Sequence, residues 1–201
     1  MSKVLQELSK MNETSLRSEV LEPLKMVSGK VVACEPGVFD QQMFERKIQP
    51  GSYPVVIWWH EETQLIAAAE LKLADSEPVR WEMATKLGQN MDELEEGHIF
   101  GYPVDTGLGC FADQEAICQM SEIEARLVRE LGDDFISFYD DALDDVLMEH
   151  DDEWGNFIVS KENGLNAILF RTGYGDGFYA SYWGFDEDGQ LVSLVTDFNV
   201  L

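Results

Sequence analysis

The chain has 201 residues, of which 45% are hydrophobic, and these values fit one folded domain rather than a disordered segment. Its 39 acidic and 14 basic residues give a net charge of −25, which argues against nucleic acids and anionic membrane surfaces as direct partners. No stretch approaches the roughly 20 apolar residues of a membrane span and no signal peptide is recognised, so neither is expected.

The first 26 residues are predicted to be helical. Val4, Leu5 and Leu8 share one face of this helix, and an apolar stripe continues beyond them. Pro23 is expected to end or kink the helix, because proline lacks the amide donor that a helix interior requires. We therefore predict an N-terminal helical arm over residues 1–28.

From Lys30 to about residue 85 the residue pattern is typical of β-strands. A short β run is expected at Lys30–Cys34, and the apolar segments Tyr53–His60 and Gln64–Ala74 are expected to form a hairpin. Apolar and polar residues alternate over Val79–Thr85, which predicts a further strand.

A strand, a tight turn and a second strand are predicted over His98–Phe111. Asp113 is suited to cap the N-terminus of a helix, and Gly132 is suited to end it. A second helix is expected over Asp134–Met148, with its apolar residues buried.

Acidic residues concentrate in this helical region. Ser121 to Glu153 contains thirteen acids and two arginines, a net charge of −11. Asp140, Asp141, Asp144 and Asp145 repeat at i, i+4, where like charges repel each other on a helix. A chain that keeps such a face is expected to use it for binding, although a solvated helix face explains the same pattern.

The C-terminal part carries the strongest hairpin signals. Three Asx-Gly pairs, at Asn163-Gly164, Asp176-Gly177 and Asp188-Gly189, separate runs of β-branched and aromatic residues. They predict a four-strand antiparallel meander. The fold class is therefore α+β, with a mainly antiparallel sheet and two or three helices packed on it, in a single domain over residues 29–201.

Aromatic side chains cluster in the predicted meander. Strand alternation places Tyr179 and Trp183 on the same face, with Phe178 and Tyr182 on the other. One face is expected to fill the core, and the other to line a pocket or an interface, where tyrosine and tryptophan are enriched. Tyr179 and Trp183 are the candidate binding residues of this cluster.

Two loop acids are weak candidates for catalysis. Asp105 and Asp176 lie among glycines, where a carboxylate can act as a general base or a metal ligand, or can simply occupy a turn. Asp105 begins an Asp-Thr-Gly triplet like that of aspartic proteases, but those enzymes need two such loops and this chain has one. No phosphate loop and no Gly-x-Ser-x-Gly elbow is present, so the catalytic residues stay unknown.

Cysteine and histidine usage gives no metal or cofactor site. Cys34, Cys110 and Cys118 are too few and too scattered for a disulfide framework or a structural zinc site. We expect all three to be buried as small hydrophobic residues, in a protein from a reducing compartment such as the cytoplasm.

Several strings of residues carry a resemblance to a known family. They are Gly175-Asp176-Gly177-Phe178-Tyr179, Tyr182-Trp183-Gly184 and Val195-Thr196-Asp197-Phe198, preceded by Gly101-Tyr102, Val104-Asp105, Gly107 and Gly109-Cys110-Phe111, and by Arg80-Trp81-Glu82, Tyr53-Pro54-Val55 and Gly29-Lys30-Val31-Val32-Ala33-Cys34. With these strings the chain resembles the uncharacterised bacterial family known as domain of unknown function 4241. The resemblance covers roughly residues 29–201 and implies a bacterial, cytoplasmic protein. It implies no activity, and it singles out Asp105 and Asp176 only as positions that match the family's motifs.

Two hypotheses follow, and the first is favoured. The chain is a non-enzymatic, acidic interaction module that binds a basic protein, as an inhibitor or an immunity protein does. Alternatively, it is a small-molecule-binding protein or an enzyme with a pocket around Asp105 and Asp176. Convergence of these two carboxyls in one pocket would favour the second hypothesis, and wide separation the first. The oligomeric state is left open, and solubility alone also explains the acidity.

Overall fold

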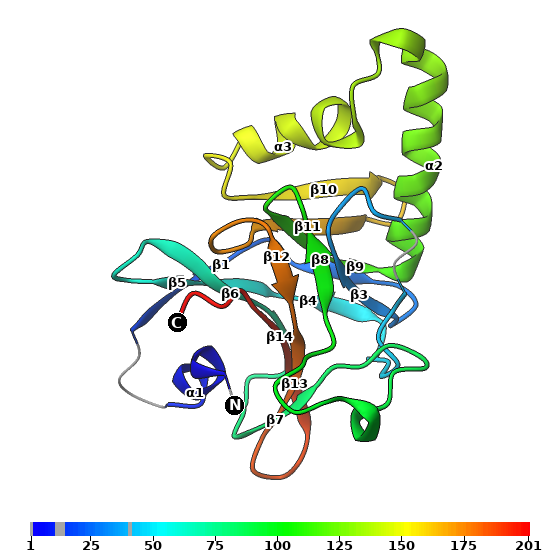
Figure 1. The fold of residues 1–201 in the computed structure, drawn as a ribbon. Helices are drawn as coiled ribbons and strands as arrows, with labels where there is room; N and C mark the ends of the chain where they lie inside the picture. Colours follow the sequence, from blue (N-terminus) through cyan, green and yellow to red (C-terminus); the bar gives the residue numbers. More distant parts are fainter. Residues whose placement is uncertain (1, 11–14, 40–41) are drawn as a thin grey trace.

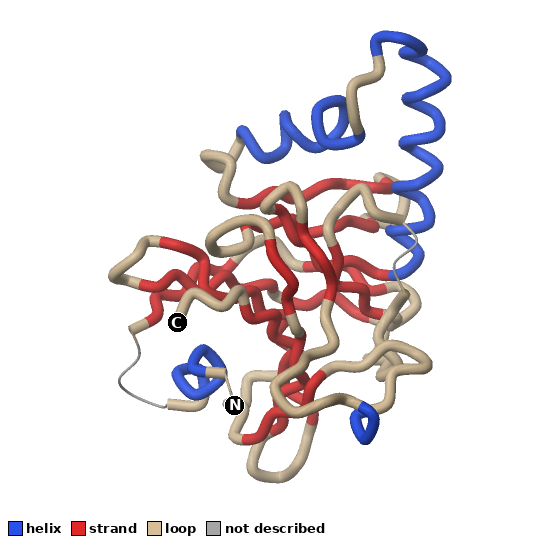
Figure 2. The backbone as a smooth tube through the Cα atoms, viewed as in Figure 1, coloured by secondary structure: helices blue, strands red, loops and turns tan. Residues whose placement is uncertain are grey.

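The computed structural model describes residues 2–10, 15–39 and 42–201 of the chain, and most of them lie in antiparallel sheets (Figures 1 and 2). This confirms the predicted fold class. The largest sheet has six strands, in the spatial order β1 (Leu16–Val20), β5 (Val55–His60), β6 (Leu65–Lys72), β14 (Leu191–Asp197), β13 (Ser181–Phe185) and β7 (Arg80–Met83). The hairpin predicted from residues 53–74 is the antiparallel pair β5–β6.

A second sheet of four strands has the order β10 (Trp154–Ser160), β11 (Leu165–Arg171), β9 (Leu108–Asp113) and β3 (Val31–Cys34). Two short pairs complete the β structure, β12 (Gly177–Tyr179) with β8 (Tyr102–Val104) and β2 (Leu24–Met26) with β4 (Gly51–Tyr53). The strands β8 and β9, predicted as strand, turn and strand, pair with different partners, because β8 joins β12 while β9 joins β11 and β3.

The strands of the C-terminal meander are divided between the two large sheets. β10 and β11 pair in the four-stranded sheet, whereas β13 and β14 pair in the six-stranded sheet. The loop that changes sheets owes its shape to Gly173 and Gly175, whose φ angles are +54° and +105°. Asp176 is not among the residues with positive φ, so the turn at this place depends on the preceding glycines and not on an Asp-Gly pair.

The core has layers that explain why many strands are buried on both faces. Side chains of the two large sheets meet in the main core, which includes Ile57, Phe111 and Leu194. The outer face of the four-stranded sheet is covered by α2 (Gln114–Leu131) and α3 (Asp144–Met148), and the outer face of the six-stranded sheet by α1 (Lys3–Leu8). With helices outside each sheet, β9 is buried at every position.

The first predicted helix of the core region is confirmed in detail. α2 follows Asp113, whose carboxylate accepts a hydrogen bond from the Glu115 amide, and Gly132 with φ +59° follows its end. The Asp113 carboxylate is fully buried and also accepts from the Val27 and Ser28 amides and the Ser28 hydroxyl. The same side chain therefore caps the helix and fixes the loop before β3.

The continuous second helix expected over Asp134–Met148 is wrong. A 3₁₀ turn (Gly132–Asp134) ends before an irregular stretch, and a π-helical segment (Tyr139–Leu143) leads into the short α3. The break has a local cause, because the Asp141 carboxylate accepts from the amides of Ile136 and Ser137 and so caps a new helical turn.

The helix expected over residues 1–26 is also wrong beyond Leu8. The structure has a two-turn helix, α1, and then the strands β1 and β2, while residues 11–14 lie outside the described residues. From Leu16 to Val20 the backbone pairs with β5, in the register Leu16↔His60 to Val20↔Val56. Sheet pairing overrides the weak helical pattern, and the boundary at residue 28 stays a prediction. No described helix has both the length and the apolar character needed to cross a membrane.

Candidate functional site

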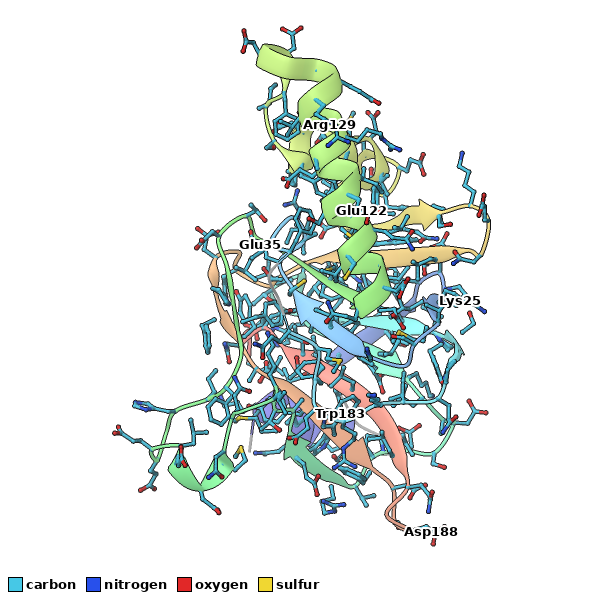
Figure 3. All side chains as sticks on the ribbon, turned by 90° about the vertical axis from the view of Figure 1, so that its right-hand side faces the viewer. Lys25, Glu35, Glu122, Arg129, Trp183 and Asp188 are labelled. Carbon is cyan, nitrogen blue, oxygen red and sulfur yellow. The ribbon has the colours of Figure 1, made fainter. Side chains whose placement is uncertain are left out.

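The acidic segment Ser121–Glu153 forms a helical projection beside the sheets (Figure 1). The fully buried side chains of α2, Ala116, Ile117 and Met120, lie in its first half, and further along only Ile123 and Leu127 among its described residues pack, partly buried, against the same cluster. Figure 3 shows Glu122 midway along α2 and Arg129 near its far end, away from the sheets. At that end Val128 and Leu131 are exposed, so the projection offers apolar as well as acidic surface.

The four aspartates predicted to bind a partner differ in their surroundings. Asp140 and Asp141 are engaged locally, since Asp140 accepts from the Ser137 hydroxyl and Asp141 caps the turn at residues 136–137. Asp144 and Asp145 begin α3, which continues directly from the π-helical segment, and their carboxylates make no hydrogen bond or ion pair within the described part of the chain. Their binding role stays a prediction.

After α3 the chain reverses tightly into β10. Asp151 and Asp152 adopt the left-handed conformation, with φ of +53° and +63°, which aspartate tolerates better than most residues. The amides of Asp152 and Glu153 donate to the carbonyls of Leu147 and His150 at 3.0 Å. This turn places the end of the acidic segment against the edge strand β1 and its neighbour β5.

A pocket of about 300 Å³ lies at this junction, and we call it the Trp59 pocket. Its lining combines four carboxylates with two indoles and an imidazole: Glu19, Trp59, Glu149, His150, Asp151, Glu153 and Trp154. The Trp59 indole donates to the Glu19 carboxylate at 3.0 Å, and the His150 ring stacks on Trp154 with 3.5 Å between ring centroids. Among the described residues, neither a lysine nor an arginine lines this pocket.

The electrostatics of the Trp59 pocket favour a cation. Burial raises the pKa of Glu153, and the nearby charges of Glu19 and Asp151 raise it further, while Arg171 opposes them. The guanidinium of Arg17 already contacts the Trp59 ring, because its Cζ lies 5.2 Å from the ring centroid. Its Nη1 lies 3.9 Å from the Glu19 carboxylate. The arrangement is suited to hold a cationic side chain.

The loops that carry Asp105 and Asp176 meet, but their carboxyls do not share a pocket. A hollow of about 560 Å³ is lined by Asp176, Arg171 and Glu153 and by Thr106 and Gly107, without Asp105. The Thr172 amide donates to the Gly107 carbonyl at 3.1 Å, which joins the two loops. Both residues are exposed, and their catalytic role stays a prediction.

The sequence interpretation missed the residue that organises the first of these loops. Glu35 is 6% exposed, and its carboxylate accepts from the amides of Asp105 and Thr106, the latter at 2.7 Å. A charged residue directly after the buried strand β3 was the available signal. Glu35 binds backbone donors, so its role is to fix the loop.

Tyr179 and Trp183 are core residues, 3% and 2% exposed. The Tyr179 hydroxyl donates to the carbonyl of Gly175 at 2.7 Å and lies 3.1 Å from that of Thr172, so it holds the sheet-changing loop. The Trp183 ring packs edge-on against Phe44 and also lines a pocket at the β7 edge. The prediction that one aromatic face fills the core is confirmed, and the binding role of these two residues stays a prediction.

Cys34 and Cys110 are buried as expected, with their sulfurs 3.6 Å apart, whereas Cys118 is exposed and that prediction was wrong. Cys118 lies on the outer side of α2, away from the sheet. Among the described residues, no group of three or more histidine, cysteine or acidic side chains is arranged to hold a metal ion.

Comparison with known proteins places the chain in a family. The model described as "Protein of unknown function (DUF4241)" matches residues 24–196, so the chain belongs to this family. Neither a curated protein nor a solved structure matched the chain.

Proposed function

We propose that this member of the DUF4241 family is a non-enzymatic, acidic interaction module that binds a basic protein, in the manner of an inhibitor or an immunity protein. The observation that carries the proposal is the Trp59 pocket, in which four carboxylates surround an indole at the end of the acidic segment. A bacterial cytoplasmic setting, consistent with three free cysteines, is part of the proposal.

A lysine or arginine side chain of the partner matches the Trp59 pocket. A volume of about 300 Å³ suits a single side chain rather than a large ligand. Carboxylates of Glu149, Asp151 and Glu153 would accept hydrogen bonds from the cation, and the indole of Trp59 would contact its apolar or guanidinium part. The contact of Arg17 with this indole is an intramolecular example of the same interaction.

Long-range charge supports the same partner. The segment Ser121–Glu153 carries a net charge of −11, and the whole chain −25, so a basic surface is attracted before contact. Such steering weakens as salt shortens the screening length to about 8–10 Å at physiological ionic strength. Binding is therefore expected to depend steeply on salt.

Capture from a lysate of the source cells at low and high salt, with mass spectrometry of the bound proteins, is the first test. We expect a basic protein at low salt that is lost at high salt. The double variant Glu149→Gln/Asp151→Asn should then weaken the captured protein about tenfold or more, since two pocket charges are removed. The matched variant Glu122→Gln/Glu130→Gln removes the same charge from α2 and should cost less. Equal effects of the two variants would place binding elsewhere.

A second function, a small-molecule-binding protein or an enzyme, is favoured by one observation. Asp176 lines the hollow of about 560 Å³ together with Arg171 and Glu153. In this case a metabolite panel should contain a compound that raises the Tm, and Asp176→Asn should remove that rise while the fold survives. A variant that unfolds, or that keeps the rise, would make Asp176 a turn residue.

A further inference from the structure

The outer edge of β7 is open along most of its length. β7 is the last strand of the six-stranded sheet, and in the described part of the chain it pairs with β13 alone. The Ala84 amide donates to the Ser181 carbonyl at 2.8 Å, just beyond the end of β7. The even-numbered residues of β7 therefore point their backbone N–H and C=O groups toward β13. By the alternation of an antiparallel ladder, Trp81 and Met83 point theirs outward.

A short segment at Phe44 and Glu45 pairs on this outer side, but only beyond the end of β7. The Glu45 amide donates to the Thr85 carbonyl at 2.9 Å, and Phe44 forms an antiparallel bridge with Lys86. Thr85 is odd-numbered, which agrees with the outward direction of Trp81 and Met83. The position beside Thr85 and Lys86 is thus occupied by Phe44 and Glu45, whereas no strand of the described residues pairs at the continuing position beside Trp81 and Met83.

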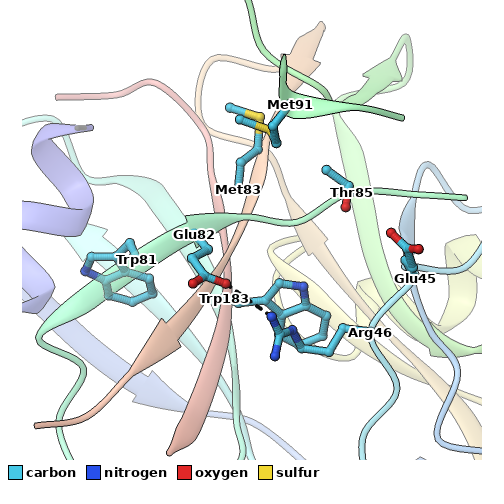
Figure 4. Close-up of a pocket in the computed structure, with 8 residues that line it drawn as sticks. All are labelled: Glu45, Arg46, Trp81, Glu82, Met83, Thr85, Met91 and Trp183. Carbon is cyan, nitrogen blue, oxygen red and sulfur yellow. Dashed lines mark hydrogen bonds and ion pairs between the residues drawn. The ribbon is translucent and has the colours of Figure 1, made fainter. Parts of the chain in front are cut away.

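A hollow of about 670 Å³ lies at this position (Figure 4). Its lining comes from both faces of β7 and from the segments on either side: Glu45, Arg46, Trp81, Glu82, Met83, Thr85, Met91 and Trp183. Residues from both faces of one edge strand line a common space only when that space lies at the edge itself. The hollow therefore lies where a neighbouring strand would lie.

The two sides of the hollow differ in chemistry. On one face of β7, Trp81 and Met83 present apolar side chains, and Figure 4 shows Met91 beside Met83. On the other face Glu82 contacts two guanidiniums, Arg46 at 3.1 Å and Arg80.

Both arginines are fixed over one ring. Their Cζ atoms lie 5.1 Å (Arg46) and 4.2 Å (Arg80) from the centroid of Phe185. These two guanidiniums share the single carboxylate of Glu82, so this cluster of three side chains carries one net positive charge in a chain of net charge −25.

We propose that the β7 edge binds an extended peptide segment of another protein, which adds to the six-stranded sheet as an antiparallel strand. The backbone groups of Trp81 and Met83 would pair with the peptide backbone. Alternating side chains of the peptide would then be apolar beside Trp81 and Met83 and acidic beside Arg46 and Arg80. The favoured ligand is therefore an apolar–acidic–apolar segment, and this proposal is independent of the basic partner proposed for the Trp59 pocket.

Charged side chains at a sheet edge also serve to prevent unwanted pairing. Under that explanation Arg46, Glu82 and Arg80 block the edge, and no peptide backbone pairs with β7. The two explanations differ at the amides of Trp81 and Met83, which become protected only when a strand is added.

The test uses the whole ¹⁵N-labelled protein and the peptide acetyl-Thr-Ile-Glu-Ile-Thr-amide. We expect shifts of the Trp81 and Met83 amide resonances and slower hydrogen exchange at both. The same peptide with lysine in place of glutamate should bind about tenfold more weakly, because it meets the two arginines with like charge. A peptide methylated on its backbone nitrogens should not bind, since it cannot pair with an edge.

Arg46→Glu should lower the affinity about tenfold, whereas Lys47→Glu, which makes the same charge change outside the hollow, should lower it less than about twofold. Thermal unfolding of both variants, and the neutral variant Arg46→Gln, check that the fold is kept. Unchanged Trp81 and Met83 amides at millimolar peptide, or equal binding of the methylated peptide, would overturn the proposal. Pairing of β7 with a second copy, seen as a concentration-dependent dimer in sedimentation, would also overturn it.

Discussion

The two edges of the six-stranded sheet have the same aromatic residue type among different charged residues. At the β1 edge, Trp59 and Trp154 are accompanied by four carboxylates. At the β7 edge, Trp81 and Trp183 are accompanied by Arg46, and Arg80 contacts Glu82 of the same site. Indoles supply large, rigid surface at both edges, so the surrounding charges decide what kind of partner each can accept.

The net charge of a protein does not describe the charge of each part of its surface. A net charge of −25 favours basic partners, yet at the β7 edge two guanidiniums, Arg46 and Arg80, share the single carboxylate of Glu82. The surroundings of Arg17 and Arg46 show how the two edges differ in charged residues. Arg17 lies over an indole among carboxylates, whereas Arg46 lies over Phe185 and shares Glu82 with a second arginine.

The largest expected effect tests whether the indoles are structural at both edges. Trp59→Ala and Trp183→Ala should each lower the free energy of unfolding by about 3–5 kcal/mol, because both rings belong to the main core and truncation leaves a cavity. Chemical denaturation monitored by far-UV circular dichroism measures this. A loss below about 1 kcal/mol at either position would show that its indole serves binding alone.

A smaller effect concerns pH at the β1 edge. Glu153 has a raised pKa, so the folded state holds its proton more tightly than the unfolded chain does. Its contribution to stability is therefore present below the unfolded pKa and is lost as pH rises through the folded pKa. A bound cation should lower the pKa of Glu153, and cation binding should weaken as pH falls through that pKa.

Carboxyl ¹³C NMR of Glu153, with and without a hexa-arginine peptide, measures this shift. An unchanged pKa in the presence of saturating peptide would show that the cation does not enter the Trp59 pocket. Asp188, at the tip of the β13–β14 hairpin (Figure 3), serves as a distant reference carboxyl.

The smallest expected effect compares charge at the two edges directly. Glu82→Gln should change stability by less than about 1 kcal/mol, since its ion pairs are exposed. It should strengthen the Ile-Glu-Ile peptide severalfold, because Arg46 and Arg80 lose their shared carboxylate. Glu19→Gln, at the opposite edge, should leave the affinity for this peptide unchanged, and fluorescence anisotropy of a labelled peptide compares the two variants. The electrostatic explanation of the β7 edge fails if Glu82→Gln weakens the peptide.

Local features of this fold were predictable from the sequence. The cap at Asp113, the stop at Gly132 and the β5–β6 hairpin depend on neighbouring residues, and all three are present. The prediction of a continuous second helix failed because the Asp141 carboxylate accepts a hydrogen bond from the Ile136 amide, five residues earlier in the chain. This side-chain bond competes with the backbone bonds of a continuous helix. The prediction of a long N-terminal helix failed because residues 16–20 pair with β5. The local sequence pattern of these residues does not show that distant partner.

The candidate sites depended on contacts between distant residues. Glu19, Trp59 and Glu153 come together only through pairing of β1 with β5 and through the turn before β10. The edge at Trp81 and Met83 exists because the segment at Phe44 pairs with Lys86 and not further along. Sequence spacing could single out Asp176, but it could not show that Asp105 is absent from the lining of the hollow beside it.

The three thiols of this chain differ in access, and that difference makes α2 a natural attachment point for a reporter. Cys34 and Cys110 are buried, and hydrogen bonding with Cys34 together with burial raises the pKa of the Cys110 thiol well above its usual range. Cys118 alone is exposed, so a maleimide dye on the unmutated protein should label one site on the first half of α2. Its fluorescence would then report the arrival of a partner on the acidic segment, without any engineered cysteine.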